Sequence, residues 1–271
     1  DRTTPNPQQS SGTSLLGKVV WRAGEGQRHV LTLEHVGKDS EVELLSSRAK
    51  PPYTGTPAQQ AALVVDEDAA KTMERSRLTW DGRFPVQAGL ADNLQTTVTW
   101  QDSAARDKGQ TVRNDGGVRL RDISYEERAL QATLQADKNV QMPPGWSQTI
   151  TYGIDLVRTD ISSFADGSDP PPLPAFVPKK YFPDTRDSAQ ALYVQSEVSD
   201  GRWTIVPGVR IDRFAIKVLS QDGYYPTVSA TPGSSLSGSA TSPKLGVLWR
   251  ANPTWAVFAN AAGGFRAPEG Q

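Results

Sequence analysis

The residue types best suited to bind a metal ion are the two histidines, His29 and His35. They lie in a stretch that alternates apolar and polar residues, so a strand would place both side chains on one face. At about 3.3 Å per residue they would lie roughly 20 Å apart, too far to share one metal ion. The spacing therefore predicts no shared metal site. We expect two separate histidines that lie either on the outer surface or, if the strands form a barrel, in its lumen.

Other ionisable residues do not form a recognisable catalytic motif. Asp66, Glu67 and Asp68 lack the alternation and the glycine of a calcium loop, so we expect solvated loop charge. Glu126 and Arg128 share one face of a predicted strand, where we expect an ion pair that points into a polar lumen. The sequence contains no GxSxG, HExxH or phosphate-binding loop, and no cysteine. We therefore predict that the protein is not an enzyme and has no covalently bound cofactor.

Composition excludes further classes of protein. The 271 residues include 29 Lys and Arg against 30 Asp and Glu, so no basic field favours nucleic acid. No segment approaches the roughly 18 consecutive apolar residues of a membrane-spanning helix. A hydrophobic content of 37% fits both a soluble β-protein and a transmembrane barrel, whose apolar residues occupy every second position.

Strict alternation of apolar and polar residues is the clearest structural pattern in the sequence, and the strands it predicts would position the histidines and charged residues named above. Leu94, Thr96, Val98 and Trp100 share one face of a predicted strand, and polar residues share the other. No helical period of comparable length occurs. Alternation and turn residues together predict ten strands, near residues 14–23, 28–38, 70–83, 91–103, 119–137, 147–159, 189–199, 202–216, 243–250 and 255–266.

The connections alternate in length. Short turns are predicted at 24–27, 84–90, 138–145, 200–201 and 251–254, and long polar links at 46–68, 104–118, 160–188 and 217–242. Short turns at one end and long loops at the other are typical of outer-membrane barrels. Six of the seven tryptophans lie near a short turn, as expected for a girdle at the lipid headgroups; these are Trp21, Trp80, Trp146, Trp203, Trp249 and Trp255. A soluble sandwich or propeller with tryptophans in its core remains the alternative on pattern alone.

Two segments of the C-terminal third resemble the TonB-dependent outer-membrane receptors, and among them the haem and haemoglobin receptor family. The first, LYVQSEVSDGRWTIVPGVRIDRF at 192–214, contains a Pro-Gly-x-Arg-x-Asp pattern made of Pro207, Gly208, Arg210 and Asp212. The second, SPKLGVLWRANPTWAVFANAAGGFRAPEG at 242–270, ends in a FRAP box made of Phe265, Arg266, Ala267 and Pro268. Weaker similarities extend the resemblance over nearly the whole chain.

The resemblance implies an antiparallel transmembrane barrel of about 22 strands around an N-terminal plug. Residues 1–271 would form a partial barrel domain of roughly ten strands, an interior fragment without the plug and its TonB-contacting segment. The FRAP box is the candidate cargo-binding motif. The histidines that bind haem iron in this family would lie outside the sequence.

The function implied by the resemblance is uptake of haem, free or from haemoproteins, across the bacterial outer membrane. Haem would be cargo and not a resident cofactor. The partners would be the cargo, the TonB-ExbB-ExbD system acting through the plug, and outer-membrane lipid. The alternatives are a receptor for a siderophore or another metal chelate, an adhesin or structural outer-membrane barrel, and a soluble β-domain that binds a partner.

Overall fold

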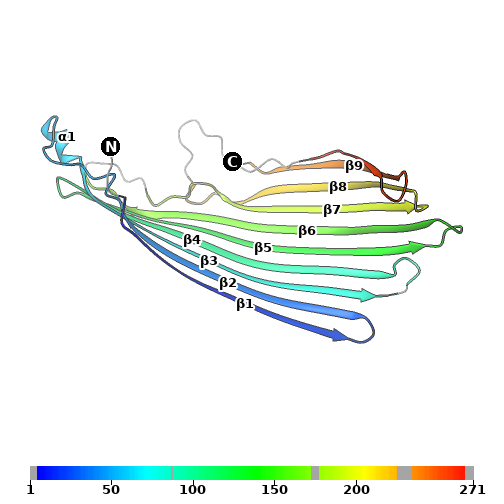
Figure 1. Ribbon diagram of the computed structural model, residues 1–271. Helices are drawn as coiled ribbons and strands as arrows, with labels where there is room; N and C mark the ends of the chain where they lie inside the picture. Colours follow the sequence, from blue (N-terminus) through cyan, green and yellow to red (C-terminus); the bar gives the residue numbers. More distant parts are fainter. Residues whose placement is uncertain (1–4, 87, 172–176, 225–233, 266–271) are drawn as a thin grey trace.

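The computed structural model describes residues 5–86, 88–171, 177–224 and 234–265, and these form one antiparallel sheet (Figure 1). Each strand pairs with its neighbours in the sequence, in the order β1 to β10, and the first and last strands are not paired with each other. The predicted all-β antiparallel architecture and its ten strands are confirmed. The strands are β1 (Gln8–Ala23), β2 (Gln27–Glu43), β3 (Val64–Pro85), β4 (Asn93–Arg113), β5 (Val118–Val140), β6 (Ser147–Ser168), β7 (Asp184–Ser199), β8 (Trp203–Ser220), β9 (Leu236–Arg250) and β10 (Ala256–Ala262).

The only helix in the described part of the chain is α1 (Pro57–Ala61), in the connection between β2 and β3. Thr56 begins it with a capping box. The Thr56 hydroxyl accepts from the backbone N–H of Gln59, and the Gln59 side-chain oxygen accepts from the backbone N–H of Thr56. No helix in the described residues is long and apolar enough to cross a membrane.

The strand register sorts the side chains onto two faces of different chemistry. Leu33 of β2, Leu78 of β3, Trp100 of β4 and Leu130 of β5 pair directly across four strands on one face. The row beside it belongs to the opposite face and begins with Glu34, Arg77 and Gln101. One apolar and one polar face is the pattern of a barrel wall, with lipid outside and a polar lumen inside. We therefore call these the outward and the lumenal face.

The sheet contains almost no conventional hydrophobic core. The buried apolar residues of the described chain are few and mostly alanine, whereas many large apolar side chains are exposed. Leu192 is 59% exposed, Ile211 52% and Leu33 47%, and all three lie on the outward face. Because a water-exposed surface of this kind would be unfavourable, the outward face is built to contact hydrocarbon.

The two ends of the sheet differ as predicted, with one correction. The connections 24–26, 86–92, 141–146, 200–202 and 251–255 lie at one end, and α1 lies at the other (Figure 1). However, the predicted long loop at 104–118 is wrong: β4 runs to Arg113, β5 begins at Val118, and the tight turn 114–117 joins them. The longer links at the α1 end are 44–63, 169–183 and 221–235.

Aromatic side chains gather on the outward face beside the short turns. Trp21 stacks on His29 with ring centroids 4.9 Å apart, and His29 stacks on Trp80 at 6.0 Å. Trp203 and Trp249 form a second stack at 5.7 Å. Aromatic rings at one margin of an apolar band are typical of the membrane interface, which supports the predicted girdle at this end.

Candidate functional site on the lumenal face

Polar side chains on the lumenal face bond to one another across neighbouring strands. Arg77 donates from Nε to Gln101 Oε1 at 2.9 Å and forms an ion pair with Glu34 at 3.4 Å. Thr97 of β4 donates to Asp81 of β3 at 2.7 Å, nearer to the short turn between the same two strands. Such cross-strand pairs fix the polar wall, because each carboxylate or amide receives a partner inside the lumen.

Arg210 is the centre of a second network on this face. Its Nη1 lies 2.6 Å from Asp155 Oδ2 on β6, and its Nε lies 2.9 Å from Asp212 Oδ1 on its own strand. The guanidinium carbon also lies 5.9 Å from the centre of the Tyr193 ring on β7, within the range of a cation–π contact. The Tyr193 hydroxyl donates to Gln135 Oε1 at 3.2 Å. The Arg and Asp of the Pro-Gly-x-Arg-x-Asp pattern therefore anchor a network that spans β5 to β8.

Glycines create the space in which these side chains lie against the sheet. A Cβ on Gly153 would stand 2.5 Å from the Tyr193 hydroxyl, and a Cβ on Gly208 would stand 2.7 Å from Lys244 Cε. Gly208 belongs to the same sequence pattern as Arg210. Its lack of a side chain lets Lys244 cross β8 and donate to Gln195 on β7.

An open cavity of about 610 Å³ lies over this network. Lys244 has no carboxylate partner within the described part of the chain, whereas Arg210 has two. The cavity can therefore accept an anionic group at Lys244, beside a lining that includes the Tyr193–Arg210 pair. Its lining includes Gln135, Asp155, Tyr193, Gln195, Arg210, Pro243, Lys244 and Gly263.

The FRAP box begins beside the same cavity. The Phe265 ring stacks on Phe214 of β8, with centroids 5.4 Å apart. A Cβ on Gly238 would stand 2.7 Å from the Phe214 ring, so this glycine makes room for the stack. The Gly263 amide donates to the Pro243 carbonyl at 2.9 Å, and both residues line the cavity. Arg266, Ala267 and Pro268 lie outside the described residues.

The histidines lie on the outward face, so the lumen alternative for them is wrong. His29 is sandwiched between Trp21 and Trp80, and His35 Nδ1 lies 3.0 Å from Ser76 Oγ. Because they occupy the apolar face, neither is placed to contact cargo inside a lumen. No group of three potential metal-binding side chains occurs among the residues that the structure describes.

Two further predictions about charged residues need correction. Arg128 shares the outward face with Leu130, and its partner is Asp102 on β4 at 2.9 Å, not Glu126. Asp66 to Asp68 lie within β3, which begins at Val64, and are not loop residues. Arg48 forms ion pairs with Asp66 and with Asp68, and it was not identified from the sequence because its partners belong to a different segment.

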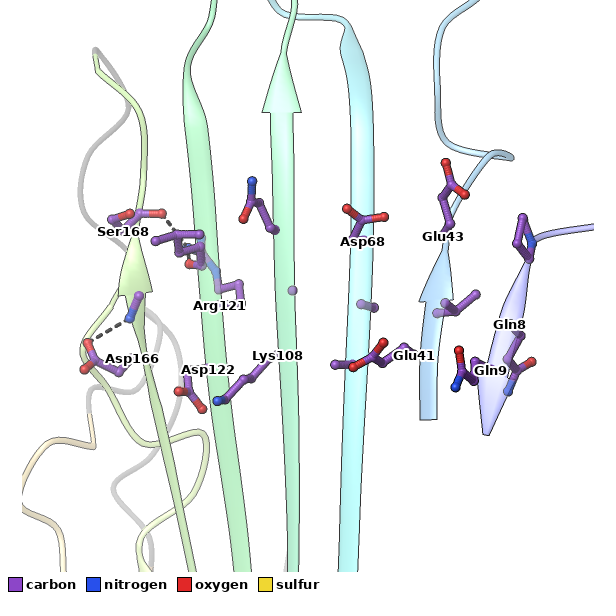
Figure 2. Close-up of a pocket in the computed structure, with 18 residues that line it drawn as sticks. Gln8, Gln9, Glu41, Glu43, Asp68, Lys108, Arg121, Asp122, Asp166 and Ser168 are labelled. Carbon is purple, nitrogen blue, oxygen red and sulfur yellow. Dashed lines mark hydrogen bonds between the residues drawn. The ribbon is translucent and has the colours of Figure 1, made fainter. Parts of the chain in front are cut away.

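A second open hollow, of about 1010 Å³, crosses β1 to β6 near the α1 end (Figure 2). Strand alternation places Glu41, Lys108, Asp122 and Asp166 on the outward face. Asp122 is neutralised by Arg106, whose Nε lies 2.6 Å from Oδ1. This groove lies outside the lumen, so it is a poorer cargo site than the cavity at Lys244.

An open meander with an apolar outward face, a polar lumenal face and an aromatic margin defines a segment of an outer-membrane β-barrel wall. The model of the TonB dependent receptor-like β-barrel family matches residues 21–271. The chain therefore belongs to this family of outer-membrane receptors. A search of curated proteins found no match.

Solved structures agree on the fold. The chain is similar to a double mutant of the Serratia marcescens haemophore receptor HasR, in complex with its haemophore HasA and haem. This match has 16% identity and a TM-score of 0.64, and covers 95% of this chain and 36% of that one. It is also similar to BauA, the ferric preacinetobactin receptor of Acinetobacter baumannii, with 14% identity, a TM-score of 0.53, and coverage of 93% and 39%. The chain thus spans little more than a third of either receptor.

Proposed function

We propose that this chain is part of the barrel of an outer-membrane receptor that imports haem, free or taken from a haemoprotein. The observation that supports this most is that two separate sequence signatures meet at one lumenal cavity. Arg210 belongs to the Pro-Gly-x-Arg-x-Asp pattern, and Pro243 and Gly263 belong to the second segment, which ends in the FRAP box. Residues from both segments that resemble the haem receptor family thus line the same cavity on the lumenal face.

The chemistry of the cavity suits a haem group in passage. Haem presents a flat apolar ring system and two carboxylates. Lys244 supplies an ammonium group without a carboxylate partner in the described chain, and the Tyr193 ring, covered on one face by Arg210, belongs to the same lining. The similarity to HasR, crystallised with its haemophore and haem, is consistent with this cargo.

Transport in this proposal breaks no bond in the cargo. Loops at the α1 end would capture the haem, and a plug inside the complete barrel would move when TonB-ExbB-ExbD acts on it. The lumenal residues described above would contact cargo or plug, and the outward face would contact outer-membrane lipid. Arg266 of the FRAP box is proposed as a further cargo contact.

A ferric siderophore or another metal chelate is the second candidate cargo. The similarity to the ferric preacinetobactin receptor favours it, and an anionic chelate would also suit Lys244 and Arg210. Family membership sets aside the adhesin and the soluble β-domain alternatives.

Haem binding to the complete receptor tests the proposal. We expect the purified receptor to bind haem with a change in haem absorbance, and Lys244→Gln to weaken binding about threefold to tenfold, the loss of one charge-assisted contact. The matched control is Lys18→Gln, which removes an exposed lumenal lysine on β1, away from the cavity. A wild-type receptor that binds a ferric siderophore but not haem would overturn the proposal.

A further inference from the structure

A group of basic side chains interrupts the outward face on β6 to β8, in the half of these strands nearer to the longer connections. It consists of Arg158 on β6, Arg186 on β7, and Arg213 and Lys217 on β8. Strand alternation places them on the same face as Leu156, Leu192 and Ile211. We call these four residues the outer basic patch.

The patch has more positive than negative charge. Asp160 is its one carboxylate, and it accepts from Arg186 Nε at 2.6 Å and from Arg158 Nη2 at 3.1 Å. Arg213 and Lys217 are exposed, and neither forms an ion pair or side-chain hydrogen bond with any residue that the structure describes. On the outward face of β7 the next carboxylate is Asp184, which is held by Lys180 at 2.6 Å, and Asp187 lies on the lumenal face.

The register makes this charge unfavourable unless an anion is present. Arg186 and Lys217 are direct cross-strand partners. Like charges opposite each other in an antiparallel pair destabilise the sheet. The same level of the sheet on β3 to β5 holds Ser76 and the Asp102–Arg128 pair, which carry no net charge. The excess of positive charge is therefore local to β6–β8.

The position along the strand identifies the surroundings of the patch. On β8, Trp203 lies in the aromatic margin beside the short turn, and Ile211 is the last apolar outward residue before Arg213. About ten residues separate Trp203 from Arg213, which is the length of a transmembrane strand tilted by about 45°. Arg213 and Lys217 should then lie at the outer leaflet headgroups, on the side of the longer connections.

We propose that the outer basic patch is a binding site for the phosphate group of an outer-leaflet lipid. The site rests on the outer-membrane location given above. Arg213 and Lys217 would bind phosphate oxygens, Arg158 and Arg186 would complete the charge, and the acyl chains would lie against Leu192 and Ile211. Arginine forks suit phosphate, and basic residues at a membrane surface attract anionic lipid.

The test measures lipid bound to the complete receptor by native mass spectrometry. The probes are lipid A with its phosphates, the same lipid with its phosphates removed, and inorganic phosphate. The variant is Arg213→Gln with Lys217→Gln. The control is Lys18→Gln with Lys38→Gln, which removes two exposed lysines from the lumenal face.

We expect the patch variant to bind phosphorylated lipid A about tenfold to thirtyfold more weakly than wild type. The reason is that each basic residue near anionic lipid raises the affinity roughly fivefold, and the variant removes both Arg213 and Lys217. The control should bind as wild type does, and the dephosphorylated lipid and inorganic phosphate should bind poorly to all three proteins. Equal binding by wild type and patch variant would overturn the site. Equal binding of dephosphorylated lipid or free phosphate would overturn the assigned ligand.

Haem binding by the same preparations separates this inference from the proposed cargo. The patch lies on the opposite face from Lys244, so its variant should keep the haem affinity of wild type. Loss of lipid binding with unchanged haem binding supports both proposals. A wild type that binds lipid through the patch but no haem would overturn only the cargo.

Discussion

Arg210 of β8 reaches across β7 to Asp155 of β6, with 2.6 Å between Nη1 and Oδ2. Tyr193, on the strand between them, stands over Gly153 and beneath the guanidinium. Two charged residues and one ring thus join three strands on the lumenal face, at the cavity where we place the cargo.

Replacement of Arg210 tests that network. In Arg210→Gln, Asp155 and Asp212 lose their ion pairs, so we expect the free energy of unfolding to fall by about 0.5–1 kcal/mol, the range for partly exposed pairs. Haem affinity of the complete receptor should also fall, because two unpaired carboxylates would then repel the haem carboxylates. Arg75→Gln, an exposed arginine on the lumenal face of β3, is the control. Unchanged haem affinity in Arg210→Gln would contradict the role given to this network.

A methyl group at Gly238 tests whether the Phe214–Phe265 stack positions the FRAP box. The new Cβ would stand 2.7 Å from the Phe214 ring, which must then move away from Phe265. We expect Gly238→Ala to reduce haem uptake several-fold while the amount of receptor in the membrane changes little. Gly89→Ala, where a Cβ meets nothing within 4 Å, should leave uptake unchanged. Normal uptake by Gly238→Ala would show that the stack does not position the motif.

The carboxylate of Asp92, in the connection 86–92, should make the stability of the fold depend on pH. A hydrogen bond from Lys138, followed by one from the Asn139 amide, lowers the pKa of Asp92 below its ordinary value. The carboxylate therefore stabilises the fold above its unfolded pKa, and this stabilisation is lost as pH falls through the lowered folded pKa. Thermal unfolding should show Asp92→Asn less stable than wild type at neutral pH, with the two converging in strong acid. A gap that stays constant down to strong acid would contradict this assignment.

The aromatic margin should stabilise the sheet in lipid. Trp80→Ala removes a ring that stacks on His29 and contacts Phe84, with centroids 6.0 Å and 6.3 Å apart. We expect a loss of about 2 kcal/mol in the free energy of unfolding from lipid vesicles, within the usual range for a large aromatic residue. Trp255→Ala provides the comparison, because Trp255 is 70% exposed. Equal losses for both would mean that the stack adds nothing to general lipid contact.

The strands inside the apolar band were predictable because only one face meets lipid. Leu94, Thr96, Val98 and Trp100 alternate with polar residues for this reason. Beyond the band both faces meet water, so the alternation ends while backbone pairing continues. That is why β4 extends to Arg113 where the sequence predicted a loop. The outward position of Arg128 could have been inferred, because it shares its parity with Leu130 and Leu134.

The candidate site was only partly predictable. The two short motifs pointed to Arg210 and Phe265; Tyr193 and Lys244 lie in the quoted segments but in neither motif, and Asp155 lies outside both segments. Those three meet through the register of β6, β7, β8 and β9, which local patterns do not specify. The roles of glycines 153, 208 and 238 also depend on which side chain crosses over them, and so appear only in three dimensions.

Growth of iron-starved cells that express the complete receptor as their only iron-uptake receptor is the most direct test of the proposed cargo. Haem, or a ferric siderophore in a parallel culture, would be the sole iron source. We expect growth on haem that requires TonB and that Lys244→Gln slows. Growth on the ferric siderophore together with none on haem would contradict a haem receptor and assign the lumenal cavity to a chelate.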